Sequence, residues 1–352
     1  MKLKPKILLV GPASPHVVAH YERIRNCTGD VHLVSNSTLP PFELSQTTVV
    51  DFGLRNPLNW WRTPAQIRKV IATFRPDIVH VHQANAVAFH TVRANASQRI
   101  PMVLTVWGSD ILVSPKKSIF LLAMVRYILR QVSSITAGSH HLAEKTRELL
   151  SNPEVKVHMC NFGVAANRTK AQKEDLIYTN RHHFPLYRVD EVIRTFAQFV
   201  QGFGRAHWKL IIAGDGPKTN ELKALASALG VSDQCTFTGF LPPHENHKNY
   251  AKAKIYASFP ESDSAAISLL EAMYHGCIPV VSNLPATNEW VTDSENGVVV
   301  RHNGDNPFER AMPLIQERIV VANRLRVVNE VSTEAAEKCF CSVIHETLVK
   351  SA

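Results

Sequence analysis

The sequence has no apolar run long enough to span a membrane, and its six cysteines lack the paired spacings of metal sites or disulfide frameworks. The closest pair, Cys339 and Cys341, falls in a predicted helix. The lack of paired cysteine spacings predicts free thiols in a reducing compartment. The apolar run after Lys4 has the length of a strand and leads into Gly11, so it does not predict a secretory signal.

Acidic residues are fewer than basic ones, with 30 Asp and Glu against 39 Lys and Arg and a net charge of +9. A basic surface favours anionic partners such as nucleotides, nucleic acids or anionic lipids, and does not choose among them. The basic residues are dispersed rather than striped, which disfavours a nucleic-acid-binding protein. At 352 residues and 45% hydrophobic content, the chain fits two globular domains, each with its own core.

No Gly-x-Gly-x-x-Gly run follows a predicted strand. Gly11 follows the strand at 6–10 and Gly214 follows the strand at 208–213, but neither opens such a run with an acidic residue about twenty positions on. An NAD(P)-dependent Rossmann oxidoreductase is therefore a weak alternative. The sequence does alternate predicted strands and helices along its length, which predicts an α/β fold.

The stretch 253–282 organises the second half of the sequence. An apolar run at its start predicts a buried strand, a polar loop follows over 258–264, and a helix runs from about 265 to Tyr274, where Gly276 ends it. Small residues before this helix leave its first backbone N–H groups open to an anionic ligand.

Two carboxylates frame this unit: Asp263 in the loop and Glu271 two turns into the helix. Burying Glu271 among the neighbouring Leu, Ala and Met residues is costly unless the carboxylate is hydrogen-bonded, and ribose hydroxyls are suitable partners. The alternative is a glutamate on the polar face of an ordinary amphipathic helix. Spacing alone leaves both interpretations open.

Asp263 is followed, after seven residues, by Glu271, which lies inside Ser-Leu-Leu-Glu-Ala-Met and is followed by Gly-Cys-Ile-Pro-Val-Val. This pattern resembles the acidic signature of the retaining family 4 glycosyltransferases, the group 1 glycosyltransferases of the GT-B fold. The first acid of that signature is usually Glu; here it is Asp263, with Glu261 two residues earlier. Further similarity is found at 77–85, at 101–112 and at 178–190.

The resemblance implies an α/β fold of two facing Rossmann-like domains with a cleft between them. It implies an acceptor-binding domain over 1–165 and a nucleotide-sugar-binding domain over 166–325. A helical segment over 326–352 is expected to pack back on the first domain.

In the resembled family, an Arg and a Lys a few residues later hold the donor phosphates. Arg181 matches the Arg. The Lys has no clean counterpart, because Tyr187 or Arg188 occupies its place, and we assign Arg188. The resemblance also implies donor contacts from two glycine turns, from the start of the helix and from its buried acid: Gly214, Gly239, Ser264, Ala265, Ala266, Ile267 and Glu271.

The segment Pro76-Asp-Ile-Val-His-Val-His82 predicts a strand that ends at the ligand-binding edge of a parallel sheet. His80 and His82 share one face of that strand, which raises the question of a metal. We expect none, because no third ligand stands nearby at ligand spacing. The resemblance implies instead that His82 contacts the donor sugar or the reacting centre.

Two further loops supply candidates for the acceptor side or the cleft. Gly11 and His16 follow the first strand, and Trp107-Gly-Ser-Asp110 follows the strand at 101–106 and matches a motif of the family. A structural His16 and a helix-capping Asp110 are the alternatives.

The segment 116–130 combines Lys and Arg with Phe, Leu and Ile. Such a helix is either a core helix with charged ends or an interfacial helix that leans on a membrane. The second interpretation predicts peripheral contact with an anionic membrane.

The resemblance thus implies a retaining hexosyltransferase that moves a sugar from a nucleotide-diphosphate sugar, UDP-linked before GDP-linked, to a glycan or lipid-linked acceptor. Cell-surface polysaccharide or lipopolysaccharide synthesis would be its setting, in the cytoplasm or at the inner face of the cytoplasmic membrane. His82, Asp263 and Glu271 are the expected catalytic residues. No metal or other cofactor is expected, because Arg181 and the helix N-terminus would stabilise the leaving diphosphate. No nucleic-acid partner is expected, because the basic residues are dispersed along the sequence. A catalytically inactive GT-B binding subunit is the alternative.

Overall fold

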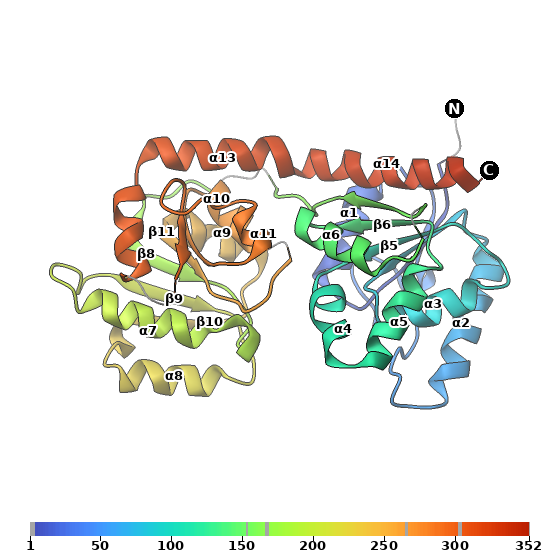
Figure 1. Ribbon diagram of the computed structural model, residues 1–352, viewed down its shortest axis with the longest axis horizontal. Coiled ribbons are helices and arrows are strands. Elements are labelled where there is room, and N and C mark those ends of the chain that lie inside the picture. The colour runs from blue at the N-terminus through green and yellow to red at the C-terminus, as the bar shows by residue number, and fades with distance from the viewer. Residues whose placement is uncertain (1–3, 153, 166–168, 265–266, 302–304, 352) are drawn as a thin grey trace. The chain divides into compact units, whose positions relative to one another are not determined.

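The computed structural model describes residues 4–152, 154–165, 169–264, 267–301 and 305–351. The chain divides into one unit of residues 1–162 and 333–352 and a second unit of residues 163–332. Each unit is built on its own parallel β-sheet with helices packed against it (Figure 1). The predicted α/β class is confirmed.

The first unit has a seven-stranded sheet in the order β3-β2-β1-β4-β5-β6-β7. The strand order reverses between β1 and β4, and the loops at the carboxyl ends of these strands form the usual ligand edge of such a sheet. Its strands are β1 (Ile7–Val10), β2 (Val31–Ser35), β3 (Thr47–Val49), β4 (Ile78–His82), β5 (Met102–Val106), β6 (Ser134–Ala137) and β7 (Lys156–Met159).

The central strands β1, β4 and β5 are buried along their whole length, as helices on both faces of a parallel sheet require. Local signals start the helices: Ser14 caps α1 and Asn85 caps α3 through side-chain oxygens. The helices of this unit are α1 (Pro15–Ile24), α2 (Asn59–Phe74), α3 (Ala86–Asn95), α4 (Ser114–Lys117), α5 (Ile119–Leu129), α6 (His140–Leu149) and α14 (Thr333–Ser351).

The second unit has a six-stranded sheet in the order β10-β9-β8-β11-β12-β13, and its strand order reverses between β8 and β11. Its strands are β8 (Glu174–Thr179), β9 (Lys209–Ala213), β10 (Cys235–Gly239), β11 (Ala253–Ser258), β12 (Ile278–Ser282) and β13 (Val298–Val300). Its helices are α7 (Val189–Val200), α8 (Thr219–Ala228), α9 (Pro243–Lys252), α10 (Ile267–Tyr274), α11 (Pro285–Asn288), α12 (Pro307–Ala311) and α13 (Glu317–Val331).

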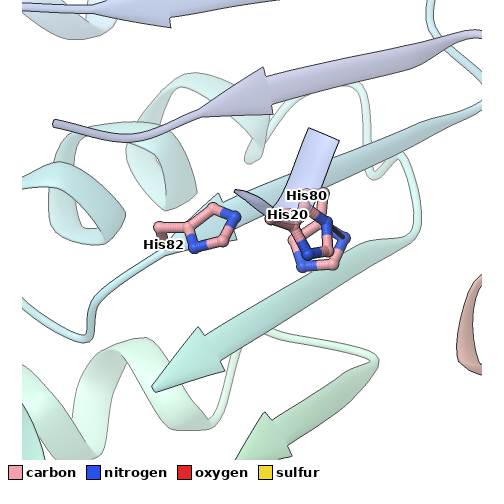
Figure 2. Close-up of side chains that lie close together, drawn as sticks. All are labelled: His20, His80 and His82. Carbon is pink, nitrogen blue, oxygen red and sulfur yellow. Dashed lines mark hydrogen bonds between the residues drawn. The ribbon is translucent and has the colours of Figure 1, made fainter. Parts of the chain in front are cut away.

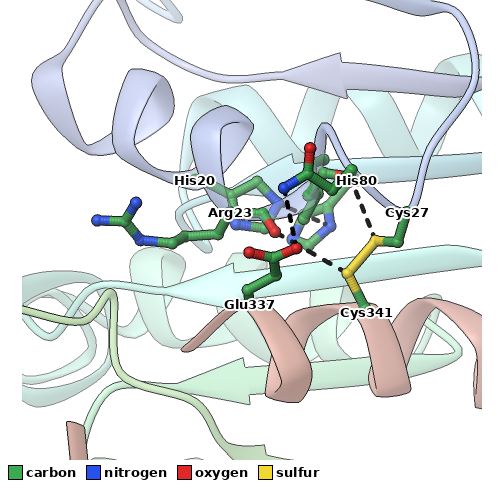
Figure 3. Close-up of a disulfide and its surroundings, with 8 residues drawn as sticks. His20, Arg23, Cys27, His80, Glu337 and Cys341 are labelled. Atoms are coloured by element: carbon green, nitrogen blue, oxygen red, sulfur yellow. Dashed lines mark hydrogen bonds between the residues drawn. A yellow bond between two sulfur atoms is a disulfide. The ribbon is translucent and has the colours of Figure 1, made fainter. Parts of the chain in front are cut away.

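The expectation of free thiols is wrong for four of the six cysteines. Cys27 pairs with Cys341 (Figure 3), and Cys160 pairs with Cys339. The partners are 314 and 179 residues apart in sequence, so spacing carries no sign of the pairing. Helix α14 packs against α1 and β5 within this unit and thereby brings Cys341 to Cys27 and Cys339 to Cys160. Among the residues that the structure describes, the free cysteines are Cys235 and Cys277, both in the second unit.

Within the described ranges, no helix combines the length and the low charge that a bilayer span would need. The basic apolar segment at 116–130 is interrupted at Ser118, whose extended backbone separates α4 from α5 and whose hydroxyl caps α5.

Candidate functional site

Arg181 occupies the loop after β8 and lies beside the start of α10. Its Nη2 is 2.7 Å from Asp263 Oδ2, and its Nη1 donates to Ser268 Oγ at 3.1 Å. The ring centroid of Tyr187 is 4.5 Å from the guanidinium carbon. Burial is the largest single effect and would lower the pKa of Arg181, but the charge of Asp263 together with the neighbouring tyrosines raises it. A largely buried, fixed cation therefore stands at the first turn of a helix.

Two glycine turns complete this edge of the sheet. Gly214 N–H donates to the carbonyl of Gly239 at 2.8 Å, which joins the loops after β9 and β10. A Cβ on Gly214 would lie 2.3 Å from the carbonyl oxygen of Arg181, and its φ of +122° also requires glycine. The structure thus brings together three of the predicted donor-binding positions.

Both carboxylate oxygens of Asp263 accept hydrogen bonds from neighbouring residues. Oδ2 pairs with Arg181, and Oδ1 accepts from the backbone N–H of Ser264 at 2.9 Å. Ala265 and Ala266 lie outside the described residues, and Ile267 is the first residue of α10. In this geometry Asp263 orients Arg181.

Glu271 lies one turn beyond Ser268 on α10, with 23% of its side chain exposed. Its Oε1 is 3.5 Å from Nε2 of His247, a residue of α9 that sequence reasoning did not single out. Burial, with the charge of Glu271 as a lesser cause, raises the pKa of Tyr178 and of Tyr250. Glu271 is thus half-buried beside polar groups rather than on a solvated helix face.

Of the two candidates for the missing lysine, the structure places Tyr187 and not Arg188 beside Arg181. Arg188 has a left-handed backbone with φ of +47°, and its Nη2 is 3.6 Å from Glu191 Oε1. It lines a separate pocket of about 530 Å³ with Phe259 and other residues after β11, β12 and β13.

In the first unit, His82 at the end of β4 is fully buried. The indole Nε1 of Trp107 donates to His82 Nδ1 at 3.1 Å. An indole N–H can only donate, so His82 Nδ1 accepts and the neutral ring carries its proton on Nε2. Burial, reinforced by the neighbouring histidines, lowers the pKa of His82 well below its ordinary value and keeps the ring neutral.

His82 belongs to a cluster of three buried histidines with His80 and His20 (Figure 2). His20 Nε2 is 3.2 Å from His80 Nδ1, and His80 Nε2 is 2.7 Å from Thr105 Oγ1. Sequence spacing did not indicate a third histidine, because His20 comes from α1 and only its packing on the sheet brings it close.

One nitrogen from each of these rings lies within 4.8 Å of the others, a spacing that resembles a metal site. A histidine that binds metal normally donates its second ring N–H to an acceptor. The second nitrogen of His82 instead accepts from Trp107, which opposes ligation through Nε2. We therefore keep the expectation that this protein needs no metal as a prediction.

Asp110 is buried, and its carboxylate accepts from the backbone N–H groups of Ala84 and Gly108, each at 2.8 Å, and of Trp107 at 3.1 Å. Burial raises the pKa of Asp110, and these hydrogen bonds oppose the rise. Asp110 thereby fixes the loops after β4 and β5, which favours a positioning role over direct contact with a ligand.

Gly11 and His16 complete this cluster. The ring centroid of His16 is 4.8 Å from that of Trp107, and a Cβ on Gly11 would lie 3.4 Å from His82 Cβ. The predicted residues of the first unit, Gly11, His16, His82, Trp107 and Asp110, therefore form one group at the carboxyl edge of its sheet.

Two parallel α/β units, each with a ligand edge where its strand order reverses, define a protein of the GT-B fold. Residues 6–139 match the family model described as glycosyl transferase 4-like, and residues 164–317 match the one described as glycosyl transferases group 1. The chain belongs to the group 1 glycosyltransferases.

Among curated relatives, the alpha-monoglucosyldiacylglycerol synthase of Streptococcus pneumoniae is 22% identical over 66% of this chain and 57% of the relative. The N-acetyl-alpha-D-glucosaminyl L-malate synthase of Bacillus anthracis is 27% identical over 63% of this chain and 60% of the relative. The matches therefore span less than two thirds of these relatives. The solved structure of Anabaena HepE in complex with UDP-glucose is 16% identical, with a TM-score of 0.78 over 97% of this chain and 100% of that one.

Proposed function

We propose that the protein is a retaining hexosyltransferase that transfers a sugar from a nucleotide-diphosphate donor to a glycan or lipid-linked acceptor. The observation that carries this proposal is the fixed Arg181 cation at the first turn of α10. A diphosphate needs such a site, because charge develops on it as the bond to the sugar breaks.

The donor site is proposed to hold the diphosphate between the Arg181 guanidinium and the N-terminus of α10. Asp263 and Tyr187 keep the guanidinium in place from two sides. Glu271, half-buried and one turn beyond Ser268 on α10, is the proposed partner of the ribose hydroxyls. These groups supply the electrostatic stabilisation without a cofactor.

On the first unit, Trp107 is the proposed contact with the reacting sugar or the acceptor. It is partly exposed, whereas His82 is fully buried beneath it. His82 then acts as a positioning residue: it accepts the indole N–H and so fixes the orientation of Trp107. Asp110 also fixes Trp107, because its carboxylate accepts a hydrogen bond from the backbone N–H of Trp107.

A UDP-sugar is the favoured donor and a GDP-sugar the next. HepE was solved with UDP-glucose and with UDP, which supports a uridine donor by analogy of fold. The relative from Streptococcus pneumoniae is named for a glycolipid product, which supports a lipid-linked acceptor and a role in cell-surface glycan synthesis.

Contact with an anionic membrane is part of the proposal, and α5 carries it. Ile119 and Phe120 are 70% and 82% exposed at its start, just after Lys116 and Lys117. Between Asp51 and Glu144 the sequence has eleven Lys and Arg and only two acids, of which Asp110 is buried and the other lies before β4.

The exposed aromatic surface continues from α5 to α2. Ring centroids are 6.0 Å apart between Tyr127 and Phe89 and 5.6 Å apart between Phe89 and Trp60. Trp61, which is 76% exposed, stacks on Arg93. Aromatic and basic side chains on one face suit the interface of an anionic bilayer. We propose a cytoplasmic protein that works at the inner face of the membrane, where its two disulfides would have to persist in a reducing compartment.

A catalytically inactive binding subunit is the second candidate. The observations that favour it are the aspartate at position 263 and the tyrosine at position 187, where the family usually has Glu and Lys. Such a subunit would still bind nucleotide sugars but would not turn them over.

A thermal-shift panel of UDP-, GDP- and ADP-sugars on the wild type and Glu271→Ala tests the proposal. A ligand that binds only the folded state adds about 2.7 kcal/mol of stability at 100 times its dissociation constant. We expect one nucleotide class to raise the midpoint of the wild type and a smaller rise in Glu271→Ala. Stabilisation by NAD(H), with none by any nucleotide sugar, would refute it.

A further inference from the structure

A polar pocket of about 440 Å³ lies at the carboxyl edge of the sheet in the first unit, separate from the histidine cluster. Its walls come from the segments after β2 and β3 and from the first two turns of α2. Six polar side chains face it: Asn36, Asp51, Asn56, Asn59, Arg62 and Gln66.

In two asparagines of this pocket, the carboxamide oxygen is hydrogen-bonded to the backbone. Asn36 Oδ1 accepts from the backbone N–H of Ala13 at 2.7 Å, and Asn56 Oδ1 accepts from the backbone N–H of Leu58 at 3.1 Å. The carboxamide oxygen is thus committed in both residues, and the NH₂ group remains as a donor of known orientation.

In Asn59, by contrast, the carboxamide NH₂ group is hydrogen-bonded. Asn59 is buried, and its Nδ2 donates to Asp51 Oδ2 at 2.7 Å and to the carbonyl of Gly53 at 3.0 Å. Both amide hydrogens are therefore used, and Oδ1 is left as an acceptor without a partner among the described residues. Asp51 also accepts from the backbone N–H of Gly53 at 2.8 Å, so its charge is already satisfied.

Arg62 and Gln66 extend this arrangement along α2. They lie three and seven residues after Asn59, on the same face of the helix. In the part of the chain that the structure describes, neither side chain has a hydrogen-bond partner, so both are available to a ligand. The pocket therefore offers fixed donors, a fixed acceptor and two adaptable groups.

We infer that this pocket binds one neutral sugar residue of the acceptor through its hydroxyl groups. Carboxamide and guanidinium groups match the paired donors and acceptors of neighbouring hydroxyls, and the preformed asparagine array reduces the entropy lost on binding. Asp51 and Arg62 balance in charge, which suits a neutral ligand. The inference rests on the proposed transfer reaction and names the acceptor class for it.

The location supports this assignment. The hydrogen bond from Ala13 to Asn36 joins the pocket to the segment between β1 and α1, which is flanked by the predicted acceptor-side residues Gly11 and His16. A sugar in the pocket would therefore lie at the same sheet edge as Trp107, with the remaining acceptor free to extend from it.

Saturation-transfer NMR on the full chain tests the inference, with methyl glucoside, galactoside, mannoside and N-acetylglucosaminide as probes and methyl glucuronide as the anionic comparison. We expect transfer to at least one neutral glycoside. Arg62→Ala and Gln66→Ala should each weaken its affinity about fivefold, the effect of one lost hydrogen bond. The matched control is Arg68→Ala, an arginine on the same helix that does not line the pocket, and it should keep wild-type affinity.

Binding of UDP is measured on the same samples, because it reports on the second unit alone. Loss of glycoside binding with unchanged UDP binding supports the inference. No transfer to any neutral glycoside, preference for the glucuronide, or equal affinity in all variants overturns it. Absence of UDP binding in the wild type would instead contradict the proposed function, whatever the glycosides do.

Discussion

At the scale of single residues, the candidate site depends on pairs that fix each other. Arg181 is oriented by Asp263, and Trp107 is oriented by His82. The sequence identified all four residues, because each lies next to a strand end or in a short motif. The sequence did not indicate which of these residues pair, because Asp263 lies 82 residues after Arg181 and Trp107 lies 25 residues after His82.

Trp107→Phe tests the positioning role of His82. The variant keeps an aromatic ring but loses the indole N–H, so His82 Nδ1 no longer has a donor. We expect turnover of the donor to fall about tenfold, because a misplaced contact near the reacting centre costs rate, while the dissociation constant for UDP stays unchanged. Phe203→Leu, at a fully exposed aromatic residue outside the cluster and outside the proposed membrane surface, is the control. Equal turnover in all three proteins would argue against this role.

The histidine cluster predicts acid sensitivity. Burial lowers the pKa of His80 to about 3 and lowers those of His20 and His82 well below their ordinary value. Above pH of about 6.5 the rings are neutral in both folded and unfolded chains. Below it the unfolded chain gains protons that the folded chain cannot, so stability is lost as the pH falls toward the folded pKa values.

Each histidine should contribute a loss of about 1.4 kcal/mol per pH unit in this window. Denaturant unfolding of wild type and His80→Gln between pH 7 and 4 measures it, and the variant should have the shallower slope. His244→Asn, at an exposed histidine, should keep the wild-type slope. A wild-type stability that does not change over this range would contradict burial of the cluster.

At the scale of elements, contiguous signals gave the best predictions. The strand, loop and helix over 253–282 appear as β11, α10 and β12. The break between α4 and α5 was missed, because Ser118 is a single polar residue within a basic apolar run. The packing of α14 on α1 and β5 allows two disulfides that no local pattern could reveal.

A count of thiols tests this disulfide arrangement. Under denaturing, non-reducing conditions, we expect only Cys235 and Cys277 to react. Cys341→Ser should destabilise the protein by about 2–4 kcal/mol, because the bridge that it removes closes a long loop. Cys235→Ser should have little effect. Six reactive thiols in the freshly isolated protein would show that the cysteines are unpaired.

The exposed start of α5 gives a second prediction at this scale. Replacing Ile119 and Phe120 together by serine removes two apolar side chains that a bilayer interface would bury. We expect binding to phosphatidylglycerol vesicles to weaken at least about tenfold in co-sedimentation. Phe203→Ser, at a fully exposed residue of the second unit, is the matched control and should bind as the wild type does. Equal binding of all three proteins would remove α5 from the membrane contact.

At the scale of the whole molecule, alternation of strands and helices was sufficient to predict the α/β class, and the motif around Asp263 and Glu271 was sufficient to identify the family. The identities of donor and acceptor were not accessible in the same way. They depend on a few side-chain contacts. The proposed acceptor pocket, with Asn36 after β2 and Asn59 at the start of α2, becomes visible only when these separate segments are placed side by side.

Calorimetric titration of UDP into wild type, Arg181→Ala and Arg188→Ala tests the central claim most directly. We expect Arg181→Ala to weaken UDP at least about tenfold, since charged hydrogen bonds to phosphate are lost, and to leave the weak binding of uridine unchanged. Arg188→Ala should bind UDP as the wild type does. Loss of UDP binding in Arg188→Ala but not in Arg181→Ala, or no binding of any nucleoside diphosphate to the wild type, would contradict the account.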